Sequence, residues 1–247
     1  MKIAVLSDIH SNVFALEAVI ENILTQNVDC VVNLGDILFG PIAPRATFEL
    51  LNKHDFTTIC GNQDRQIYEA TESDIETNPT MQFILSDLSF EPIDWMRGLP
   101  FDKQLNNDVY LCHGTPTDDL VYLLEDVSLG YPKLRSDTDV ISLLNGHKSK
   151  LVCCGHTHIP RTVKLSTGQL IINPGSVGLP AYTDDEPISH SMENYCSHAS
   201  YSIIENNGYG WINQQMKIPY DVQLAVNECK KRDRDDWSHF LLTGRKM

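Results

Sequence analysis

Five short apolar runs in this chain each end at residues whose side chains can hold a metal ion. Short runs rich in β-branched residues and bounded by turn residues predict buried strands. In open α/β sheets, ligands bind just beyond the carboxyl ends of the strands. The runs and the residues that follow them are 3–6 before Asp8 and His10, 31–35 before Asp36, 57–61 before Asn62, 109–112 before His113, and 151–155 before His156 and His158. Because they supply three Asp or Asn side chains and four imidazoles, we expect one shared site.

The N-terminal quarter of the chain alternates between strand-like and helix-like segments. The expected strands are residues 2–7, 30–34 and 56–60. One helix is expected to open near Ser11 or Asn12, which are both good N-cap residues, and another follows Pro44. This β-α-β-α-β order is typical of an α/β fold.

The remainder of the chain is first helical and then mainly extended. Residues 63–98 have a helical pattern, with Pro79 and Pro92 as breaks. A helix is expected at 137–146. The expected strands are residues 101–105, 108–112, 151–154, 161–165, 169–172, 199–205 and 210–217.

Polar segments near the C-terminus carry weaker signals. Residues 181–198 are polar and lack periodicity, which predicts a surface loop. After Pro219 we expect one short charged helix that ends on Trp237 and Phe240. The charges in 228–236 alternate in sign, which predicts a solvated face rather than a binding patch. Five histidines away from the strand ends are expected on the surface or in loops: His54, His147, His190, His198 and His239.

Composition narrows the class of protein. A chain of 247 residues is expected to form a single domain, residues 1–247. No apolar run reaches the length of about 18 residues that a membrane span requires, and no signal-peptide pattern precedes the first strand. The seven cysteines form no CxxC pair, so we expect reduced core residues in a cytoplasmic protein. The net charge of −14 argues against a nucleic-acid partner, because nucleic-acid affinity depends on Lys and Arg neutralising phosphates.

The spacing of the five blocks resembles that of the calcineurin-like metallophosphoesterases. Asn173-Pro174-Gly175-Ser176 also resembles the compact bacterial and archaeal phosphodiesterases of that superfamily. The resemblance covers residues 1–180 and implies a four-layer αββα sandwich of two mixed β-sheets flanked by helices. It also implies an enzyme, a phosphodiesterase or phosphatase that hydrolyses a small phosphorylated or nucleotide substrate.

The resemblance assigns the ligands of two divalent or trivalent metal ions. One ion would be held by Asp8, His10, Asp36 and His158, and the other by Asp36, Asn62, His113 and His156. Asp36 would bridge the ions, and a water shared between them would become the nucleophile. Mixed imidazole and carboxylate ligands favour Mn, with Fe, Zn or Ni as alternatives, over Mg²⁺ or Ca²⁺. Asp36, Asn62 and His113 are therefore also the candidate catalytic residues.

Residues beside these ligands are candidates for substrate contact. Two helices opening near Asn12 and Gln63 are expected to point their N-termini at the site, which suits a phosphate. Arg65 is a second candidate phosphate contact, with a solvent-exposed helical role as the alternative, and Asp64 is expected to support the ligands from behind. Many relatives carry His where this chain has Gln63, and Gln cannot donate a proton as an acid. We therefore expect a preference for leaving groups that depart without protonation.

Two other functions remain open at this stage. A nuclease is the first, although no basic stripe is visible in the sequence. The second is a non-catalytic metal-binding scaffold, which would be expected to have lost ligands, whereas all seven are present. The physiological substrate and the native metal are not defined by the sequence, and a homo-oligomer is compatible with it.

Overall fold

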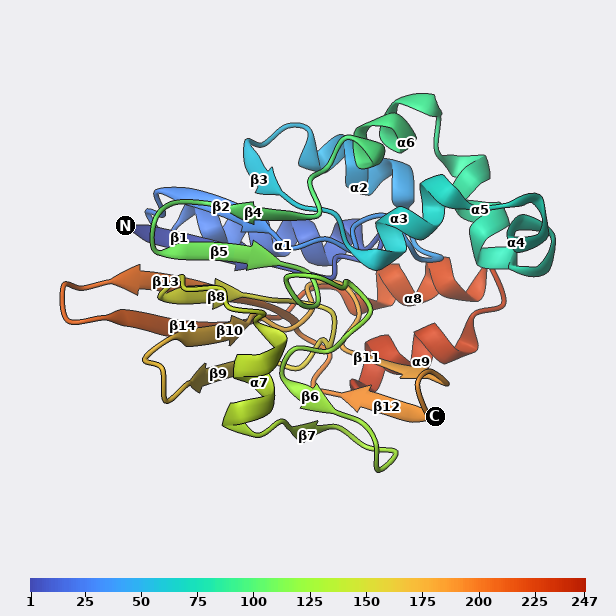
Figure 1. Ribbon diagram of the computed structural model, residues 1–247. Helices are drawn as coiled ribbons and strands as arrows, with labels where there is room; N and C mark the ends of the chain where they lie inside the picture. Colours follow the sequence, from blue (N-terminus) through green and yellow to red (C-terminus); the bar gives the residue numbers. More distant parts are fainter.

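The computed structural model describes residues 1–247 and contains two five-stranded sheets (Figure 1). The first sheet has the order β14 (Trp211–Ile218), β13 (Ala199–Asn206), β1 (Lys2–Leu6), β2 (Cys30–Asn33) and β3 (Phe56–Thr58). The second has the order β4 (Asp102–Gln104), β5 (Val109–Cys112), β8 (Leu151–Cys153), β10 (Leu170–Asn173) and β9 (Arg161–Lys164). In the first sheet β1, β2 and β3 are parallel, and β13 pairs antiparallel with β1 and with β14. In the second sheet β5, β8 and β10 are parallel, and the edge strands β4 and β9 pair antiparallel with their neighbours. Both sheets are therefore mixed.

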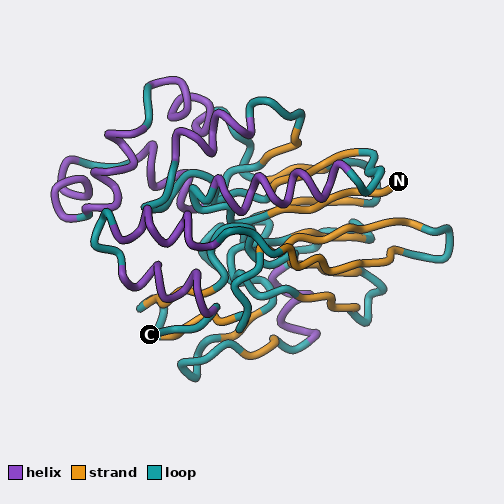
Figure 2. Tube along the Cα trace, turned by 180° about the vertical axis from the view of Figure 1, so that it is seen from behind, coloured by secondary structure: helices purple, strands orange, loops and turns teal.

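Helices and two small ribbons complete the fold. The helices are α1 (Val13–Leu24), α2 (Pro44–Leu51), α3 (Asn62–Glu69), α4 (Glu72–Thr77), α5 (Pro79–Asp87), α6 (Phe90–Arg97), α7 (Asp137–Leu143), α8 (Val222–Lys230) and α9 (Asp235–Thr243). The ribbons are β6 (Glu125–Asp126) with β7 (Lys133–Leu134), and β11 (Ala181–Asp184) with β12 (His190–Glu193). Seen from behind, most helices gather at one side and one end of the sheets (Figure 2). None of the helices is both long and apolar enough to cross a membrane.

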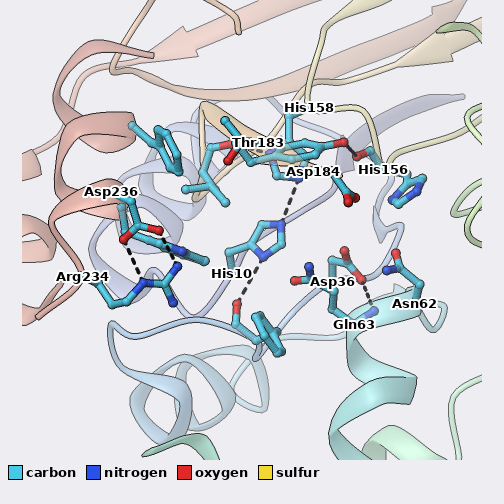
Figure 3. Close-up of a pocket in the computed structure, with 15 residues that line it drawn as sticks. His10, Asp36, Asn62, Gln63, His156, His158, Thr183, Asp184, Arg234 and Asp236 are labelled. Atoms are coloured by element: carbon cyan, nitrogen blue, oxygen red, sulfur yellow. Dashed lines mark hydrogen bonds and ion pairs between the residues drawn. The ribbon is translucent and has the colours of Figure 1, made fainter. Parts of the chain in front are cut away.

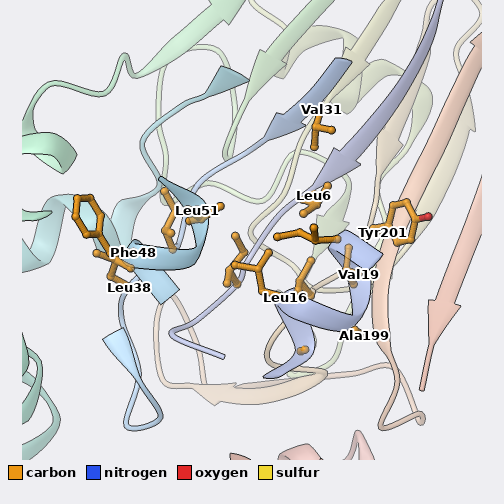
Figure 4. Close-up of a cluster of buried hydrophobic side chains, with 14 of the residues drawn as sticks. Leu6, Leu16, Val19, Val31, Leu38, Phe48, Leu51, Ala199 and Tyr201 are labelled. Carbon is orange, nitrogen blue, oxygen red and sulfur yellow. The ribbon is translucent and has the colours of Figure 1, made fainter. Parts of the chain in front are cut away.

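Alternation along the strands buries both faces of the first sheet. In β1, Ile3 and Val5 face the second sheet and pack with Leu111 and Leu151. Ala4 and the other residues of the opposite face pack against α1 and α2, in the cluster drawn in Figure 4. Because each such side chain contributes on the order of 2 kcal/mol when fully buried, this two-sided burial fixes the register of β1.

The outer face of the second sheet is covered by α7. Val140 and Leu144 pack against Tyr110, Val152 and Ile171 of that sheet. The layers are therefore helix, sheet, sheet, helix, and the predicted four-layer αββα sandwich of two mixed sheets is confirmed. All seven cysteines are free.

Three local predictions were wrong. Residues 181–198 are not a loop throughout, because β11 and β12 pair within them and bury Ala181 and Met192 completely. His190 of β12 is correspondingly buried rather than exposed, and its Nε2 lies 3.0 Å from the Tyr122 hydroxyl. The C-terminal tail forms two helices instead of one, because the chain turns at 231–234 between α8 and α9.

Candidate metal centre

The predicted ligands all lie at the carboxyl ends of strands in the two sheets. They are Asp8 and His10 after β1, Asp36 after β2, Asn62 at the start of α3 after β3, His113 after β5, and His156 and His158 after β8. Each of these side chains is at most 9% exposed. The structure therefore gathers side chains that are up to 150 residues apart in the sequence.

Asp8, His10 and His158 form the first of two candidate metal-binding groups, with one potential ligand atom each within 4.8 Å of the others. The Nε2 atoms of the two imidazoles lie 3.0 Å apart. Asp8 Oδ1 lies 3.3 Å from Nε2 of His158, and no hydrogen-bond donor satisfies this buried oxygen. Burial raises the pKa of Asp8, but the neighbouring imidazoles of His158 and His113 together outweigh burial, so the pKa falls below its usual value and the carboxyl group is ionised.

Asp36, His113 and His156 form the second group, within the same 4.8 Å limit. His113 Nε2 lies 3.4 Å from Asp36 Oδ2 and 3.0 Å from the side-chain oxygen of Asn62. Burial raises the pKa of Asp36, but the imidazoles around it, His113 foremost, together outweigh burial and lower the pKa. The α3 N-terminus also holds this carboxylate, because the backbone N–H of Gln63 donates to Asp36 Oδ1 at 2.9 Å.

Backbone carbonyl groups decide which nitrogen of each imidazole is free. A carbonyl oxygen only accepts, so the ring nitrogen that faces it must carry the proton. The donating nitrogens and their acceptors are His10 Nδ1 to Phe39 O at 3.2 Å, His158 Nδ1 to Leu179 O at 2.6 Å, His113 Nδ1 to Leu34 O at 2.8 Å, and His156 Nε2 to Leu120 O at 3.2 Å. The other nitrogen of each ring is left pointing into the site.

This arrangement fits metal ions. In the first group, Nε2 of His10 and Nε2 of His158 face each other. In the second, Nε2 of His113 faces the oxygens of Asp36 and Asn62. A positive charge between such atoms, from a metal ion or a proton, stabilises them. Burial, followed by the neighbouring His158, lowers the pKa of His10 to about 4. Burial, followed by His113, lowers the pKa of His156 to about 4. Neutral imidazoles beside ionised carboxylates are the protonation states that bind Mn²⁺, Fe or Zn²⁺.

The ligands stand on an unusual backbone. Five of the seven have a positive φ: Asp8 at 56°, His10 at 49°, Asp36 at 55°, His156 at 70° and His158 at 58°. Such a left-handed conformation costs a residue with a side chain about 1–2 kcal/mol. The main chain also approaches closely here, because a Cβ on Gly61 would lie 2.2 Å from Asp36 Oδ1.

Asp64 fastens this part of the main chain from behind. Its carboxylate accepts hydrogen bonds from the backbone N–H groups of Asp36 (2.8 Å), Ile37 (2.8 Å) and Gly61 (3.0 Å). Burial, and then the Asp36 carboxylate, raise the pKa of Asp64 to about 7, while the N–H donors act in the opposite direction. Asp64 therefore joins the ends of β2 and β3 without entering the site.

A pocket of about 280 Å³ opens over both groups (Figure 3). Its lining residues are His10, Asp36, Phe39, Asn62, Gln63, His156, His158, Leu179, Tyr182, Thr183, Asp184, Arg234, Asp236, Trp237 and Phe240. In Figure 3, Arg234 and Asp236 lie on the opposite side of His10 from Asp36 and Asn62. Two residues of the charge run at 228–236, Arg234 and Asp236, therefore line this pocket.

The two predicted phosphate contacts do not line this pocket. Asn12 is fully buried; its Oδ1 caps α1 by accepting from the N–H of Ala15, and its amide donates to Gly178 O and to the Tyr220 hydroxyl. Arg65 instead forms a two-bond ion pair with Asp119, at 3.0 and 2.7 Å. The polar atoms of Asn12 are thus bonded within the protein, and the guanidinium of Arg65 is paired with Asp119.

Residues 1–192 match a family model, the calcineurin-like phosphoesterase superfamily domain. The chain belongs to this superfamily. The resemblance inferred from the five sequence blocks is therefore confirmed. Membership implies a metal-dependent phosphoesterase that uses divalent metal ions, which agrees with the two candidate groups of ligands.

Relatives of this phosphoesterase domain extend over the whole chain. An uncharacterized protein from Methanocaldococcus jannaschii is 25% identical over 257 residues, covering 95% of this chain and 94% of that protein. The crystal structure of a metallophosphoesterase from Sphaerobacter thermophilus has a TM-score of 0.76 at 21% identity, covering 99% of this chain and 100% of that one. A hypothetical protein from Pyrococcus horikoshii has a TM-score of 0.78 at 17% identity, covering 100% and 99%. The shared fold therefore includes α8 and α9, which lie beyond the residues of the family match.

Proposed function

We propose that this phosphoesterase hydrolyses small phosphodiesters or phosphate monoesters, including nucleotide-like esters, with two bound metal ions. The proposed ligand sets are Asp8, His10, Asp36 and His158 for one ion, and Asp36, Asn62, His113 and His156 for the other. Asp36 is the proposed bridge, and Mn²⁺ is the proposed metal because the ligands mix imidazoles with carboxylates.

A single observation carries this proposal. Two buried groups of candidate ligand atoms lie beside one open pocket, and in each group imidazole nitrogens and carboxylate oxygens face one another at short range. A structural cluster would bring hydrogen-bond donors to these acceptors, whereas Asp8 Oδ1 has none. When bound, the ions would supply Lewis acidity and lower the pKa of a coordinated water.

The residues of the chain itself would orient and hold the reacting groups. The carbonyl partners keep the four imidazoles in one tautomer each, so their free nitrogens stay aimed at the site. The N–H of Gln63 and the fixed main chain behind Asp36 hold that carboxylate in place. Such preorganisation means that little rearrangement is needed at the moment of reaction.

No side chain in the pocket is an obvious acid for the leaving oxygen. Gln63 occupies the start of α3 and cannot protonate it. The Tyr182 hydroxyl lies 3.0 Å from both the Tyr122 hydroxyl and His156 O, and burial raises its pKa well above the usual value. We therefore propose that aryl esters and phosphoanhydrides, whose leaving groups depart as anions, react faster than alkyl esters.

The charge of the pocket disfavours the nuclease alternative. Arg234 is the only Lys or Arg among the lining residues, and its guanidinium is paired with Asp236. A nucleic acid would require a path of several cations for its phosphates. The scaffold alternative is disfavoured because all seven ligands are present, buried and grouped.

The test is metal-dependent hydrolysis by the full chain. After chelation, bis(4-nitrophenyl) phosphate and 4-nitrophenyl phosphate are assayed with Mn²⁺, Zn²⁺, Ni²⁺, Mg²⁺ and Ca²⁺ added back, and bound metal is counted by elemental analysis. We expect Mn²⁺ to restore activity best, and Asp36→Asn to lower both the rate, by several orders of magnitude, and the metal content. Asp137→Asn, on the exposed first turn of α7, is the control. Full activity of Asp36→Asn at matched metal content would refute the bridging assignment, and activity without metal would refute the mechanism.

A further inference from the structure

The pocket extends beyond the metal ligands toward the first turn of α9. At this end, which we call the distal end, it is lined by Arg234, Asp236, Trp237 and Asp184. The Trp237 ring lies 5.9 Å from the His10 ring, centroid to centroid, and 5.4 Å from the guanidinium carbon of Arg234. Figure 3 shows Arg234 and Asp236 on the far side of His10 from Asp36, so the remaining atoms of a substrate with its phosphate at the metal-binding groups have these side chains within the same pocket.

Arg234 is held in place but is not saturated. Its Nε and Nη2 donate to the two oxygens of Asp236 at 2.8 and 2.7 Å, and Nη1 donates to the Thr80 hydroxyl. A guanidinium has five N–H groups, so two remain without a protein acceptor. With its side chain 28% exposed, Arg234 can direct them to a ligand. Two-bond pairing with Asp236 fixes the plane of the guanidinium in advance.

The charges at the distal end disfavour a second phosphate. Arg234 contributes one positive charge, while Asp236 and Asp184 contribute two negative charges. One oxygen of Asp184 accepts the backbone N–H of Glu186 at 3.0 Å, and its other oxygen has no such bond. The local balance is therefore negative, which repels an additional anion. It offers instead N–H donors and carboxylate acceptors side by side, next to an indole.

We propose that the distal end is a subsite for an uncharged ring that carries neighbouring hydrogen-bond donors and acceptors, such as the ribose or base of a nucleoside. Hydroxyl or N–H groups of the ring donate to Asp236 or Asp184, and its oxygens accept from Arg234. The volume of about 280 Å³ lies just below the usual range of about 300–1,000 Å³ for ligand pockets, which suits one such ring beside the phosphate and not a polymer. This inference builds on the proposed function, since the phosphate end defines where the ring lies.

Binding to the metal-free full chain tests the subsite without relying on catalysis. Trp237 lines the pocket, so its fluorescence should change when a ligand occupies the distal end. Comparison with Trp237→Phe shows how much of the fluorescence change comes from Trp237 and how much from the other tryptophans. The probes are uridine, methyl riboside and pyrophosphate. We expect a saturable millimolar response to uridine, with methyl riboside showing whether the sugar alone suffices, and no response to pyrophosphate. Tighter binding of pyrophosphate than of uridine, or no saturable response to uridine, would overturn the proposal.

Substitutions distinguish ligand contact from a structural role. Arg234→Ala and Asp236→Asn are each expected to weaken uridine binding by about tenfold, the scale of one hydrogen bond to a charged group. Arg232→Ala is the matched control: Arg232 is 24% exposed, is paired with Glu228 and lies on the same segment, but does not line the pocket. Thermal unfolding checks that each variant folds. Unchanged uridine affinity in folded Asp236→Asn and Arg234→Ala would refute the subsite.

A paired assay connects the subsite to hydrolysis. Thymidine 5′-(4-nitrophenyl phosphate) and bis(4-nitrophenyl) phosphate share a leaving group and differ in the group that remains. Arg234→Ala should raise KM for the thymidine ester by about tenfold and leave the bis-aryl ester unaffected. Uridine binding without any hydrolysis would count against the proposed function while leaving the subsite intact, so the two failures are distinguishable. Equal effects on both esters would contradict the specificity role of Arg234.

Discussion

Metal binding by Asp36, His113 and His156 is expected to release a proton from His113. In the metal-free protein, burial alone would lower the pKa of His113. The Asp36 carboxylate, together with Asp8 and the Leu34 carbonyl, outweighs burial and raises the pKa to about 10 from the ordinary 6.5. A proton on Nε2 then occupies the place between His113, Asp36 and Asn62 that an ion would take. His156 has a pKa of about 4 and is already neutral, so it has no proton to lose.

The size of the effect follows from these pKa values. At pH 8 the His113 pKa of about 10 lies two units higher, so displacing the proton costs about 2.7 kcal/mol. The apparent affinity for the ion should therefore rise about tenfold for each pH unit between 7 and 9. The same proton stabilises the metal-free fold fully below pH 6.5, and this contribution is lost as the pH rises through 10.

Isothermal titration calorimetry measures the released protons directly. Mn²⁺ is titrated anaerobically into the chelated protein at pH 8 in buffers of different ionisation enthalpy, and the slope of heat against that enthalpy gives the proton count. We expect the count of the wild type to exceed that of His113→Gln by about one. His147→Gln, which alters a histidine stacked on Tyr110, is the control and should match the wild type.

A buffer-independent heat in the wild type would refute this reasoning. It would mean that Nε2 of His113 carries no proton in the metal-free state and that Asp36 does not raise its pKa. A proton count unchanged by His113→Gln would assign the released proton to another group.

Three further predictions concern other parts of the site. Asn12→Ala should lower the free energy of unfolding by about 1–2 kcal/mol, because it removes the α1 cap and the hydrogen bond to Gly178. KM should be unchanged; a large rise in KM would show that Asn12 contacts the substrate phosphate. Gln63→His should flatten the dependence of rate on leaving-group pKa across substituted phenyl phosphodiesters. An imidazole at the start of α3 can protonate the leaving oxygen, and such general acid catalysis typically raises the rate about 10²–10⁴-fold. A dependence that is already shallow in the wild type would show that another group acts as the acid. Gly61→Ala should lower both the melting temperature and the Mn²⁺ content, because the new Cβ would lie 2.2 Å from Asp36 Oδ1 and 2.4 Å from its backbone nitrogen; wild-type values for both would show that the main chain yields there.

The strand ends were readable from the sequence because two independent signals coincide there. Runs such as residues 3–6 are apolar enough to predict burial, and a residue that can bind a metal follows each run directly or one residue later. The structure places Asp8 and His10 where this pattern predicts them, beyond β1. Local sequence and the geometry of a parallel sheet together determine such positions.

Features that depend on packing between distant segments were not readable. Residues 181–198 are polar and without period, yet β11 and β12 pair because Ala181 and Met192 gain burial beneath α9 and Tyr122. Arg234 lies in a run of alternating charges, and only the docking of α9 beside β11 brings it to the pocket. The one available clue was the Trp237 and Phe240 pair, three residues apart, which indicates an apolar helix face without naming its partner.

The left-handed backbone at five of the candidate ligands lowers the stability of the fold at the positions that the proposed metal centre requires. Asp8, His10, Asp36, His156 and His158 each hold a conformation that glycine adopts without penalty. Replacing any of them by glycine would remove a local strain as well as a ligand, so the metal-free fold has something to gain from losing its own site. In a chain that did not need the ions, each of these residues could be replaced by glycine in turn, and each replacement would remove local strain from the fold. This sequence has a side chain other than glycine at all five positions, as the proposed metal centre requires.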